Sequence, residues 1–270
     1  MKQIPGKQWD NRKVPLGLFQ PSYVAGFVGK TGSGKSTALL NMLQEYQKSN
    51  TFDKFILFSP SSEDDPKYRV IDWDQIYSRY QEGRFKQIIA QQIDDMKEWK
   101  EYQKKKEVYD KFIKNGQSLG GFTNTEKKIL FGMIGGEGII EKPFATMERE
   151  PYICVVFDDL GSSSAYSNNT SNFMNAMACR CRHKNITMIH ATQHVYQIPR
   201  ALRQQCSIMA LFKTKDHKLL REIAKENSSD VNEDEFISLF EKATEDPHCF
   251  LLCDFLNENF RKNFDNLLLL

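Results

Sequence analysis

Short apolar runs alternate with amphipathic segments along much of the 270-residue chain. Continuous apolar runs bounded by turn residues are typical of strands buried on both faces of a parallel sheet. Such runs predict strands over residues 23–28, 55–59, 152–157, 186–191, 206–212 and 248–255, and we expect no strand after the last. Apolar residues at helical spacing predict helices over residues 37–47, 173–181, 215–226 and 233–243, the last with Asn232 or Asp230 as its N-cap. This alternation predicts an α/β fold with a mainly parallel sheet flanked by helices.

Residues 63–150 differ in character from the rest of the chain. From Ser78 to Lys114 the sequence is dense in Lys, Glu and Gln, with apolar residues at helical spacing, which predicts one or two helices. Gly-rich stretches at 115–121 and 132–138 are expected to be loops. We therefore expect a single domain over residues 1–270, with residues 63–150 as a helical insertion within it. The first 21 residues, which are polar and rich in Pro and Gly, are expected to form an irregular lead-in.

Composition limits the class of protein only loosely. Apolar residues make up 40% of the chain and charged residues 27%, as in an ordinary globular core, and the formal net charge is +2. A nucleic-acid partner is neither required nor excluded, because a local basic face would suffice. We expect no membrane span, since no apolar run approaches the roughly 20 residues that a spanning helix needs. The six cysteines are expected to be reduced thiols in a cytosolic or nuclear compartment, without a zinc site.

The candidate chemistry begins directly after the first predicted strand. An octet there matches the phosphate-binding pattern G-x-x-x-x-G-K-[ST], known as Walker A, and a predicted helix follows it. Glycines let backbone N–H groups wrap a phosphate, and the helix N-terminus adds positive potential. Lys35 is expected to reach the β- and γ-phosphates of a nucleoside triphosphate, and the Ser36 hydroxyl to ligate Mg²⁺. The predicted cofactors are therefore ATP and Mg²⁺, and the predicted binding residues are Gly29, Lys30, Thr31, Gly32, Ser33, Gly34, Lys35, Ser36 and Thr37.

Polar side chains follow two later predicted strands. Asp158 and Asp159 end the strand over 152–157, which is where a Walker B aspartate would hold Mg²⁺. We assign the metal to Asp158 and the positioning of the attacking water to Asp159. Gln193 follows the strand over 186–191, where an amide can orient water beside the γ-phosphate. The simpler explanation for the acidic pair is an N-cap and a surface charge.

Phosphoryl transfer also uses an arginine that neutralises charge in the transition state, often donated by a neighbouring subunit. The candidates are Arg180, Arg182, Arg200 and Arg203. We favour Arg182, because it precedes a predicted strand and could face the site of an adjacent protomer. Any one of them is more commonly a surface or DNA-facing arginine than such a catalytic arginine.

Together these segments resemble the genome-packaging ATPases of large double-stranded DNA viruses and virophages, which include the poxvirus-like enzymes of the FtsK–HerA superfamily of P-loop NTPases. The resemblance rests on Gly29–Ser36, Phe58-Ser59-Pro60, Ile153–Asp159, Arg182-His183 and Thr192-Gln193. It implies a RecA-like core whose catalytic strands are separated by an extra strand, and a ring-shaped homo-oligomer. It also implies ATP-driven pumping of duplex DNA into a preformed capsid, with a capsid or portal partner, in the virion or the host-cell cytoplasm. Many superfamily members carry Glu at the position of Asp159, and residues 63–150 match no motif of the family.

Two other functions use some of the same residues. A nucleoside or nucleotide kinase also needs a P-loop and Mg²⁺, but it needs an acceptor site as well. An ATP-gated assembly protein would bind nucleotide without acting as a motor. The Ser-rich stretch over residues 161–172 could face DNA in a ring pore, or it could be a disordered connector.

Overall fold

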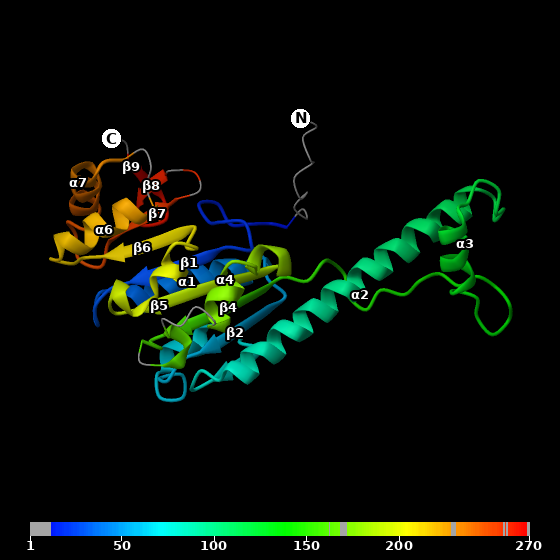
Figure 1. Cartoon of the computed structure of the whole chain (residues 1–270), viewed down its shortest axis with the longest axis horizontal. Coiled ribbons are helices and arrows are strands. Elements are labelled where there is room, and N and C mark those ends of the chain that lie inside the picture. The colour runs from blue at the N-terminus through cyan, green and yellow to red at the C-terminus, as the bar shows by residue number, and fades with distance from the viewer. Residues whose placement is uncertain are drawn as a thin grey trace. The chain divides into compact units, whose positions relative to one another are not determined.

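The computed structural model describes residues 12–161, 163–167, 172–227, 231–255, 257 and 259–268. Within these residues the strands form one sheet of nine, in the order β3-β2-β4-β5-β1-β6-β7-β8-β9 (Figure 1). The strands are β1 Val24–Val28, β2 Lys54–Phe58, β3 Gln75–Tyr77, β4 Ile153–Asp158, β5 Ile186–Thr192, β6 Ile208–Phe212, β7 Phe250–Asp254, β8 Asn259–Lys262 and β9 Asn266–Leu268. The first six strands in this order, β3 through β6, run parallel to one another. The last three, β7, β8 and β9, continue the sheet in antiparallel fashion.

The predicted α/β class is confirmed, and so is the extra strand that the resemblance implied. The P-loop strand β1 and the aspartate strand β4 are not neighbours, because β5 pairs with both of them. Every residue of β1, β4 and β5 is buried. This burial explains why these strands are continuous apolar runs in the sequence.

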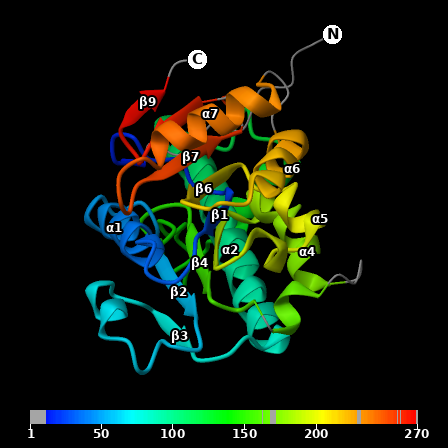
Figure 2. The same ribbon diagram turned by 90° about the vertical axis from the view of Figure 1, so that its left-hand side faces the viewer.

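The helices that pack with the sheet are short and amphipathic. They are α1 Lys35–Lys48, α4 Phe173–Ala178, α5 Arg200–Arg203, α6 His217–Asn227 and α7 Glu233–Ala243, with short 3₁₀ turns η1 Pro66–Val70, η2 Ser164–Tyr166, η3 Cys181–Lys184 and η4 Val195–Gln197. Figure 2 shows α1 on one face of the central strands, and α4 and α5 on the other. α1 places Leu39, Leu43 and Tyr46 in the main hydrophobic core, where alternate residues of the central strands meet them.

The opposite face of the sheet carries a row of aromatic rings. Phe58 of β2 stacks on Phe157 of β4 at 5.3 Å between ring centroids, and Phe157 stacks on His190 of β5 at 4.9 Å. Phe85 packs edge-on against Phe157 and Phe173. Rings from three adjacent strands thus fix the spacing between the strands that carry the candidate site.

The expectation that the sheet ends with residues 248–255 is wrong. β8 and β9 follow through short connections, and they pair in antiparallel fashion with β7 and with each other. β8 lacks a continuous apolar run because it buries only Phe260 among its four residues, and the apolar residues of β9 are few. β3 is likewise a three-residue edge strand of exposed and partly exposed residues.

The described residues form two compact units. The first contains residues up to Ile88 and from Tyr152 onward, and the second is Ile89–Pro151. Two elements of the predicted insertion over 63–150, η1 and β3, belong to the first unit. There β3 pairs with β2 and forms the edge of the sheet. The single-domain assignment stays a prediction. None of the described helices is both long and apolar enough to cross a membrane.

A single helix, α2 (Glu82–Lys114), starts in the first unit and continues through much of the second. The second unit also contains α3 (Asn124–Phe131), which begins with a Thr123–Glu126 capping box. A small core joins α2 and α3 and consists of Val108, Phe112, Phe122, Leu130 and Met133.

Two sequence expectations fall partly outside the described residues. The lead-in over residues 1–21 is described from Arg12 onward. In the stretch over 161–172, residues 162 and 168–171 lie outside the described part, and a turn at η2 lies within it. Asn172 accepts a hydrogen bond from the Met174 N–H and so caps α4.

Candidate active site

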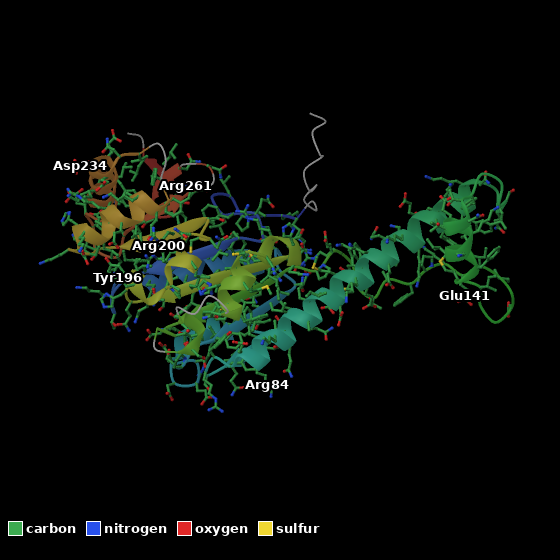
Figure 3. The ribbon with its side chains drawn as sticks, in the orientation of Figure 1. Arg84, Glu141, Tyr196, Arg200, Asp234 and Arg261 are labelled. Atoms are coloured by element: carbon green, nitrogen blue, oxygen red, sulfur yellow. The ribbon has the colours of Figure 1, made fainter. Side chains whose placement is uncertain are left out.

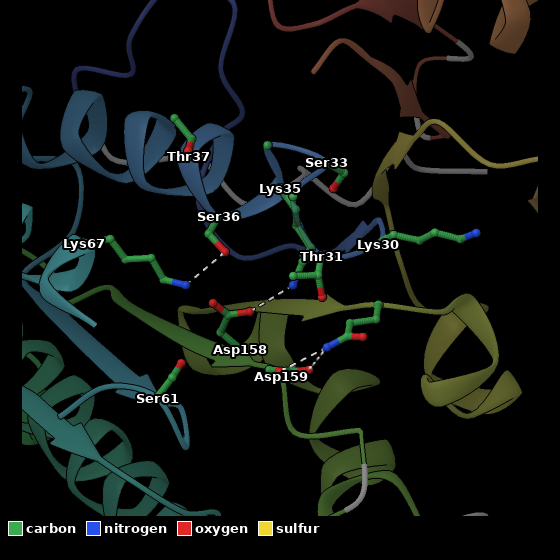
Figure 4. Close-up of a pocket in the computed structure, with 13 residues that line it drawn as sticks. Lys30, Thr31, Ser33, Lys35, Ser36, Thr37, Ser61, Lys67, Asp158 and Asp159 are labelled. Atoms are coloured by element: carbon green, nitrogen blue, oxygen red, sulfur yellow. Dashed lines mark hydrogen bonds and ion pairs between the residues drawn. The ribbon is translucent and has the colours of Figure 1, made fainter. Parts of the chain in front are cut away.

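The candidate side chains gather where parallel strands end. In the register of the sheet, Asp158 of β4 is paired with Ala191 of β5, and Thr192 is paired with Val28 of β1. The chain segments that leave these strands therefore emerge at one edge, and they line a cavity of about 240 Å³ (Figure 4). Its lining residues are Lys30, Thr31, Gly32, Ser33, Gly34, Lys35, Ser36, Thr37, Ser61, Lys67, Asp158, Asp159 and Gln193.

The loop between β1 and α1 depends on its glycines. Gly34 has a φ of 91° and Gly32 a φ of 79°, in the left-handed region that other residues rarely adopt. A Cβ atom at Gly29 would lie 2.5 Å from Ser33 Oγ and 2.6 Å from Phe212 Cβ. α1 then begins at Lys35 without a side-chain cap and without an acidic residue in its first turn. The N-terminus of α1 therefore faces the cavity as a site for an anion.

Lys35 and Asp158 form a buried ion pair at the base of this cavity. Lys35 Nζ lies 3.2 Å from Asp158 Oδ1, and the two residues are only 7% and 2% exposed. The second oxygen, Oδ2, accepts a hydrogen bond of 2.6 Å from the hydroxyl of Tyr68. Burial, and next the Asp158 charge, raise the pKa of Tyr68, so that its hydroxyl stays protonated and donates. Both carboxylate oxygens of Asp158 are thus held in place.

Asp159 points into the cavity from a strained backbone position. Its φ is 56°, uncommon for a residue other than glycine, and its N–H donates to the Ala191 carbonyl at 2.9 Å. The Gln193 side-chain amide donates to the two oxygens of Asp159 at 3.2 and 3.3 Å. This contact joins the acidic residue after β4 to the amide after β5, which lies 34 positions later in the sequence.

Gln197 holds the Gln193 segment in place. Its side-chain oxygen accepts hydrogen bonds from the backbone N–H groups of Gln193 at 3.0 Å and His194 at 3.1 Å. A Cβ at Gly161 would lie 2.3 Å from Gln197 Nε2, so the chain after Asp159 passes very close to this side chain. Sequence inspection missed Gln197, because nothing about a glutamine in a short turn indicates this role.

Lys67 is a third lysine of the cavity, beside Lys30 and Lys35, and the sequence did not reveal it. Its Nζ lies 3.4 Å from Ser36 Oγ and 2.9 Å from Asp65 Oδ2. Burial alone would lower the pKa of Lys67, but the hydrogen bond to Asp65 and the charge of Asp158 raise it above its usual value. Lys67 is therefore positively charged where it contacts the P-loop.

Ser36 and Asp158 bring a hydroxyl and a carboxylate to the same cavity. Hard oxygen donors of this kind suit Mg²⁺. In the structure Ser36 accepts a hydrogen bond from Lys67, and Asp158 contacts Lys35 and Tyr68. Within the described residues no group of three or more His, Cys, Asp or Glu side chains has the arrangement of a metal site. All six cysteines are free thiols.

The candidate arginines do not line the cavity. Arg182 is exposed and donates to Ser207 Oγ at 3.0 Å, and both residues precede parallel strands, at the edge of the sheet opposite the P-loop. Arg203 is buried and pairs with Glu226 at 3.0 Å. Arg200, labelled in Figure 3, lies 3.2 Å from the same Glu226, and Arg180 is exposed. Within one protomer, then, the described cavity has lysines but none of these arginines.

His190 lies in β5, two residues before Thr192. It is fully buried against Phe157, and its Nδ1 lies 3.1 Å from the Tyr166 hydroxyl. Burial lowers the pKa of His190 to about 3, so the imidazole is neutral at physiological pH. Its role is to pack and to anchor η2 beside the strand edge.

No protein-family model matches the chain, and no curated protein sequence matches it. Solved structures do. The genome-packaging NTPase B204 of Sulfolobus turreted icosahedral virus 2 in complex with AMP is similar with a TM-score of 0.56 at 14% identity, covering 91% of this chain and 98% of that one. The DNA-packaging ATPase B204 of Sulfolobus turreted icosahedral virus is similar with a TM-score of 0.52, at the same identity and coverage. The resemblance drawn from the motifs is thus confirmed for the fold: this chain has the P-loop NTPase fold of these viral packaging ATPases.

Proposed function

We propose that this protein is an ATP-hydrolysing motor that moves double-stranded DNA into a preformed viral capsid during virion assembly. The observation that carries the proposal is the arrangement at the strand edge. The buried Lys35–Asp158 pair and the Asp159–Gln193 pair line one cavity beneath the N-terminus of α1. A phosphate site, a carboxylate suited to a metal and a carboxylate suited to water are the parts that hydrolysis of a triphosphate requires.

Each residue has a role that follows from its position. The backbone of residues 29–34 and the Lys35 ammonium bind the phosphates. Ser36 and Asp158 would hold Mg²⁺, which when bound neutralises charge on the β- and γ-phosphate oxygens. The Asp159 carboxylate accepts a proton from the attacking water, and Gln193 fixes the orientation of that carboxylate.

The motor part of the proposal draws on the similar structures. The two B204 proteins are described as a genome-packaging NTPase and a DNA-packaging ATPase, and the present chain spans nearly the whole of each. We propose that this chain likewise acts on duplex DNA, in the virion or the host-cell cytoplasm, with a capsid or portal component as partner. We further propose a ring-shaped homo-oligomer in which Arg182 completes the site of a neighbouring protomer, because the cavity of one protomer contains none of the candidate arginines.

The test is steady-state ATP hydrolysis by the purified protein, with and without long duplex DNA. We expect DNA to stimulate turnover, and Lys35→Ala to abolish it. Asp159→Asn should lower kcat by about 10²–10⁴-fold, the usual contribution of a general base. Asp110→Asn, which alters an exposed aspartate of α2, is the matched control and should behave as the wild type.

Two results would overturn the proposal. A rate of ATP hydrolysis that is the same with and without DNA would exclude the motor function. A rate that is unchanged in Asp159→Asn would exclude Asp159 as the general base. Transfer of phosphate to an added nucleoside, in place of water, would identify a kinase.

A further inference from the structure

The chain between β2 and β3 is anchored directly to the Walker B aspartate. Tyr68 in η1 is only 3% exposed, and its hydroxyl bonds to Asp158 Oδ2 at 2.6 Å and lies 3.0 Å from Ser59 Oγ. Its backbone carbonyl accepts a hydrogen bond of 2.8 Å from the Trp73 indole. These contacts fix the start of η1 at the side of the cavity, so the residue next to Tyr68 has a defined place there.

That neighbouring residue is Lys67, which has two partners in the structure. Its ammonium lies 3.4 Å from the Ser36 hydroxyl (Figure 4). It also lies 2.9 Å from the Asp65 carboxylate and 4.8 Å from the centre of the Tyr68 ring. The Lys67 side chain is 33% exposed, so it is partly sheltered yet free to change partner. Lys35, in contrast, is held by the buried Asp158.

The contact between Lys67 and Ser36 is incompatible with a loaded site. If the Ser36 hydroxyl were to hold Mg²⁺, one of its two lone pairs would be taken by the metal, and the positive charge of the metal would repel the Lys67 ammonium. Lys67 must then leave Ser36. Ser36 lies beside the phosphate-binding loop, so the anion that Lys67 would meet on leaving Ser36 is the terminal phosphate of a bound triphosphate.

We propose that Lys67 is a phosphate-contacting residue that moves from Ser36 to the terminal phosphate when a triphosphate binds, with Asp65 as its alternative partner when only a diphosphate is present. The inference rests on the proposed nucleotide site and adds to it a cation that distinguishes the two nucleotide states. It also places this cation in the same protomer as the P-loop, separate from any arginine of a neighbour. The Asp65 carboxylate keeps Lys67 close to the cavity between the two states.

The test compares two nucleotides by isothermal titration calorimetry in the presence of Mg²⁺. The β,γ-methylene analogue of ATP carries a terminal phosphate that cannot be cleaved, and ADP lacks that phosphate. We expect Lys67→Met to weaken binding of the analogue by about tenfold or more, the value of one charge-assisted hydrogen bond, and to leave ADP binding within about twofold. Lys67→Arg keeps the charge and should restore most of the preference for the analogue.

The matched control is Lys48→Met, since Lys48 also pairs with an acid of its own segment but lies at the far end of α1. It should bind both nucleotides as the wild type does, and the thermal midpoints of all variants show whether they are folded. Equal loss of both nucleotides in Lys67→Met, or no loss of either, would overturn the inference while leaving the nucleotide site intact. Wild-type protein that binds neither nucleotide would overturn the proposed function and this inference together.

Discussion

Tyr68 illustrates how a single hydroxyl can control the candidate site. Within the described residues, the Tyr68 hydroxyl is the only side-chain donor to Asp158 Oδ2, while Lys35 binds the other oxygen. Removing that hydroxyl leaves a buried carboxylate oxygen without this partner and lets the carboxylate rotate. The ion pair with Lys35 would remain.

If Asp158 holds the proposed Mg²⁺, we expect Tyr68→Phe to lower kcat by roughly 10–100-fold, as the loss of a hydrogen-bond partner of a metal ligand does, with a smaller change in KM. Steady-state kinetics over a range of Mg²⁺ concentrations measures this effect. Tyr77→Phe is the matched control, because the Tyr77 hydroxyl bonds only to Gln75 in the described contacts and lies away from the cavity. An unchanged kcat in Tyr68→Phe would contradict the positioning role.

His190 gives the stability of the fold a pH dependence. Its pKa is lowered to about 3 in the folded state by burial, whereas an unfolded histidine titrates near 6.5. Below pH 6.5 the histidine of the unfolded chain binds a proton, whereas His190 in the folded chain stays neutral. The free energy of unfolding therefore falls as the pH falls. This contribution is complete above pH 6.5 and is lost progressively toward pH 3.

Between pH 6.5 and pH 5, this single group should lower the free energy of unfolding by about 2 kcal/mol. Urea unfolding at several pH values measures the slope. His190→Asn should flatten the slope in this window, whereas His183→Asn, at an exposed histidine, should leave it unchanged. Equal slopes for the wild type and His190→Asn would show that the imidazole is not excluded from protonation.

At this scale, sequence reasoning identified the residues that have a fixed place relative to a strand. The glycine octet, Asp158, Asp159 and Gln193 all follow predicted strands, and the carboxyl ends of parallel strands meet at one edge. The sequence did not predict three residues of the site, Lys67, Tyr68 and Gln197. They lie in 3₁₀ turns, and the path of such turns depends on tertiary contacts. No periodicity places such residues in the cavity.

Among the elements, α7 has the clearest start signal in the sequence. Asn232 accepts hydrogen bonds from the N–H groups of Asp234 at 3.1 Å and Glu235 at 2.9 Å, and the Glu235 side chain accepts one from the Asn232 N–H at 3.1 Å. Of the two predicted caps, the structure uses Asn232, and Asp230 lies outside the described residues.

We expect Asn232→Ala to lower the free energy of unfolding by about 1 kcal/mol, since two N–H groups of α7 lose their acceptor. Chemical denaturation measures the change. Glu241→Ala, at an exposed position in the last turns of α7, is the control and should stay within about 0.5 kcal/mol of the wild type. A loss in Asn232→Ala no larger than that of the control would contradict the capping role.

The elements that the sequence predicted share one physical property, burial on both faces or along one helical stripe. β1, β2, β4, β5 and β6 bury nearly every residue and are visible as apolar runs. β3, β8 and β9 lie at the two ends of the sheet order or near them, and most of their residues stay partly exposed. Pairing with a neighbouring strand defines β3 and β8, since neither has an apolar pattern in the sequence.

For the whole molecule, the proposed ring predicts that each active site is built from residues of two neighbouring protomers. If Arg182 acts on a neighbour's site, then Lys35→Ala and Arg182→Ala remove different halves of each shared site. Each variant alone should be nearly inactive. An equal mixture should recover about a quarter of the wild-type turnover, because random assembly pairs an intact Lys35 with an intact Arg182 at that frequency.

ATP hydrolysis after subunit exchange measures this recovery. Arg180→Ala, at an exposed neighbouring arginine, serves as the control and should be active without mixing. A mixture that stays inactive, or an Arg182→Ala variant with full activity alone, would assign the arginine function to another residue.

The position of β1 in the sheet also determines when the protein can fold as it is made. β1 is synthesised first, yet its two neighbours are β5, at residues 186–192, and β6, at residues 208–212. The ribosome adds residues one by one from the N-terminus, so the P-loop strand leaves the exit tunnel long before either partner exists. Until then its apolar residues have no sheet to join. Chaperone binding to the early nascent chain is the expected consequence, and the catalytic cavity cannot be completed before β5 and Gln193 have been synthesised.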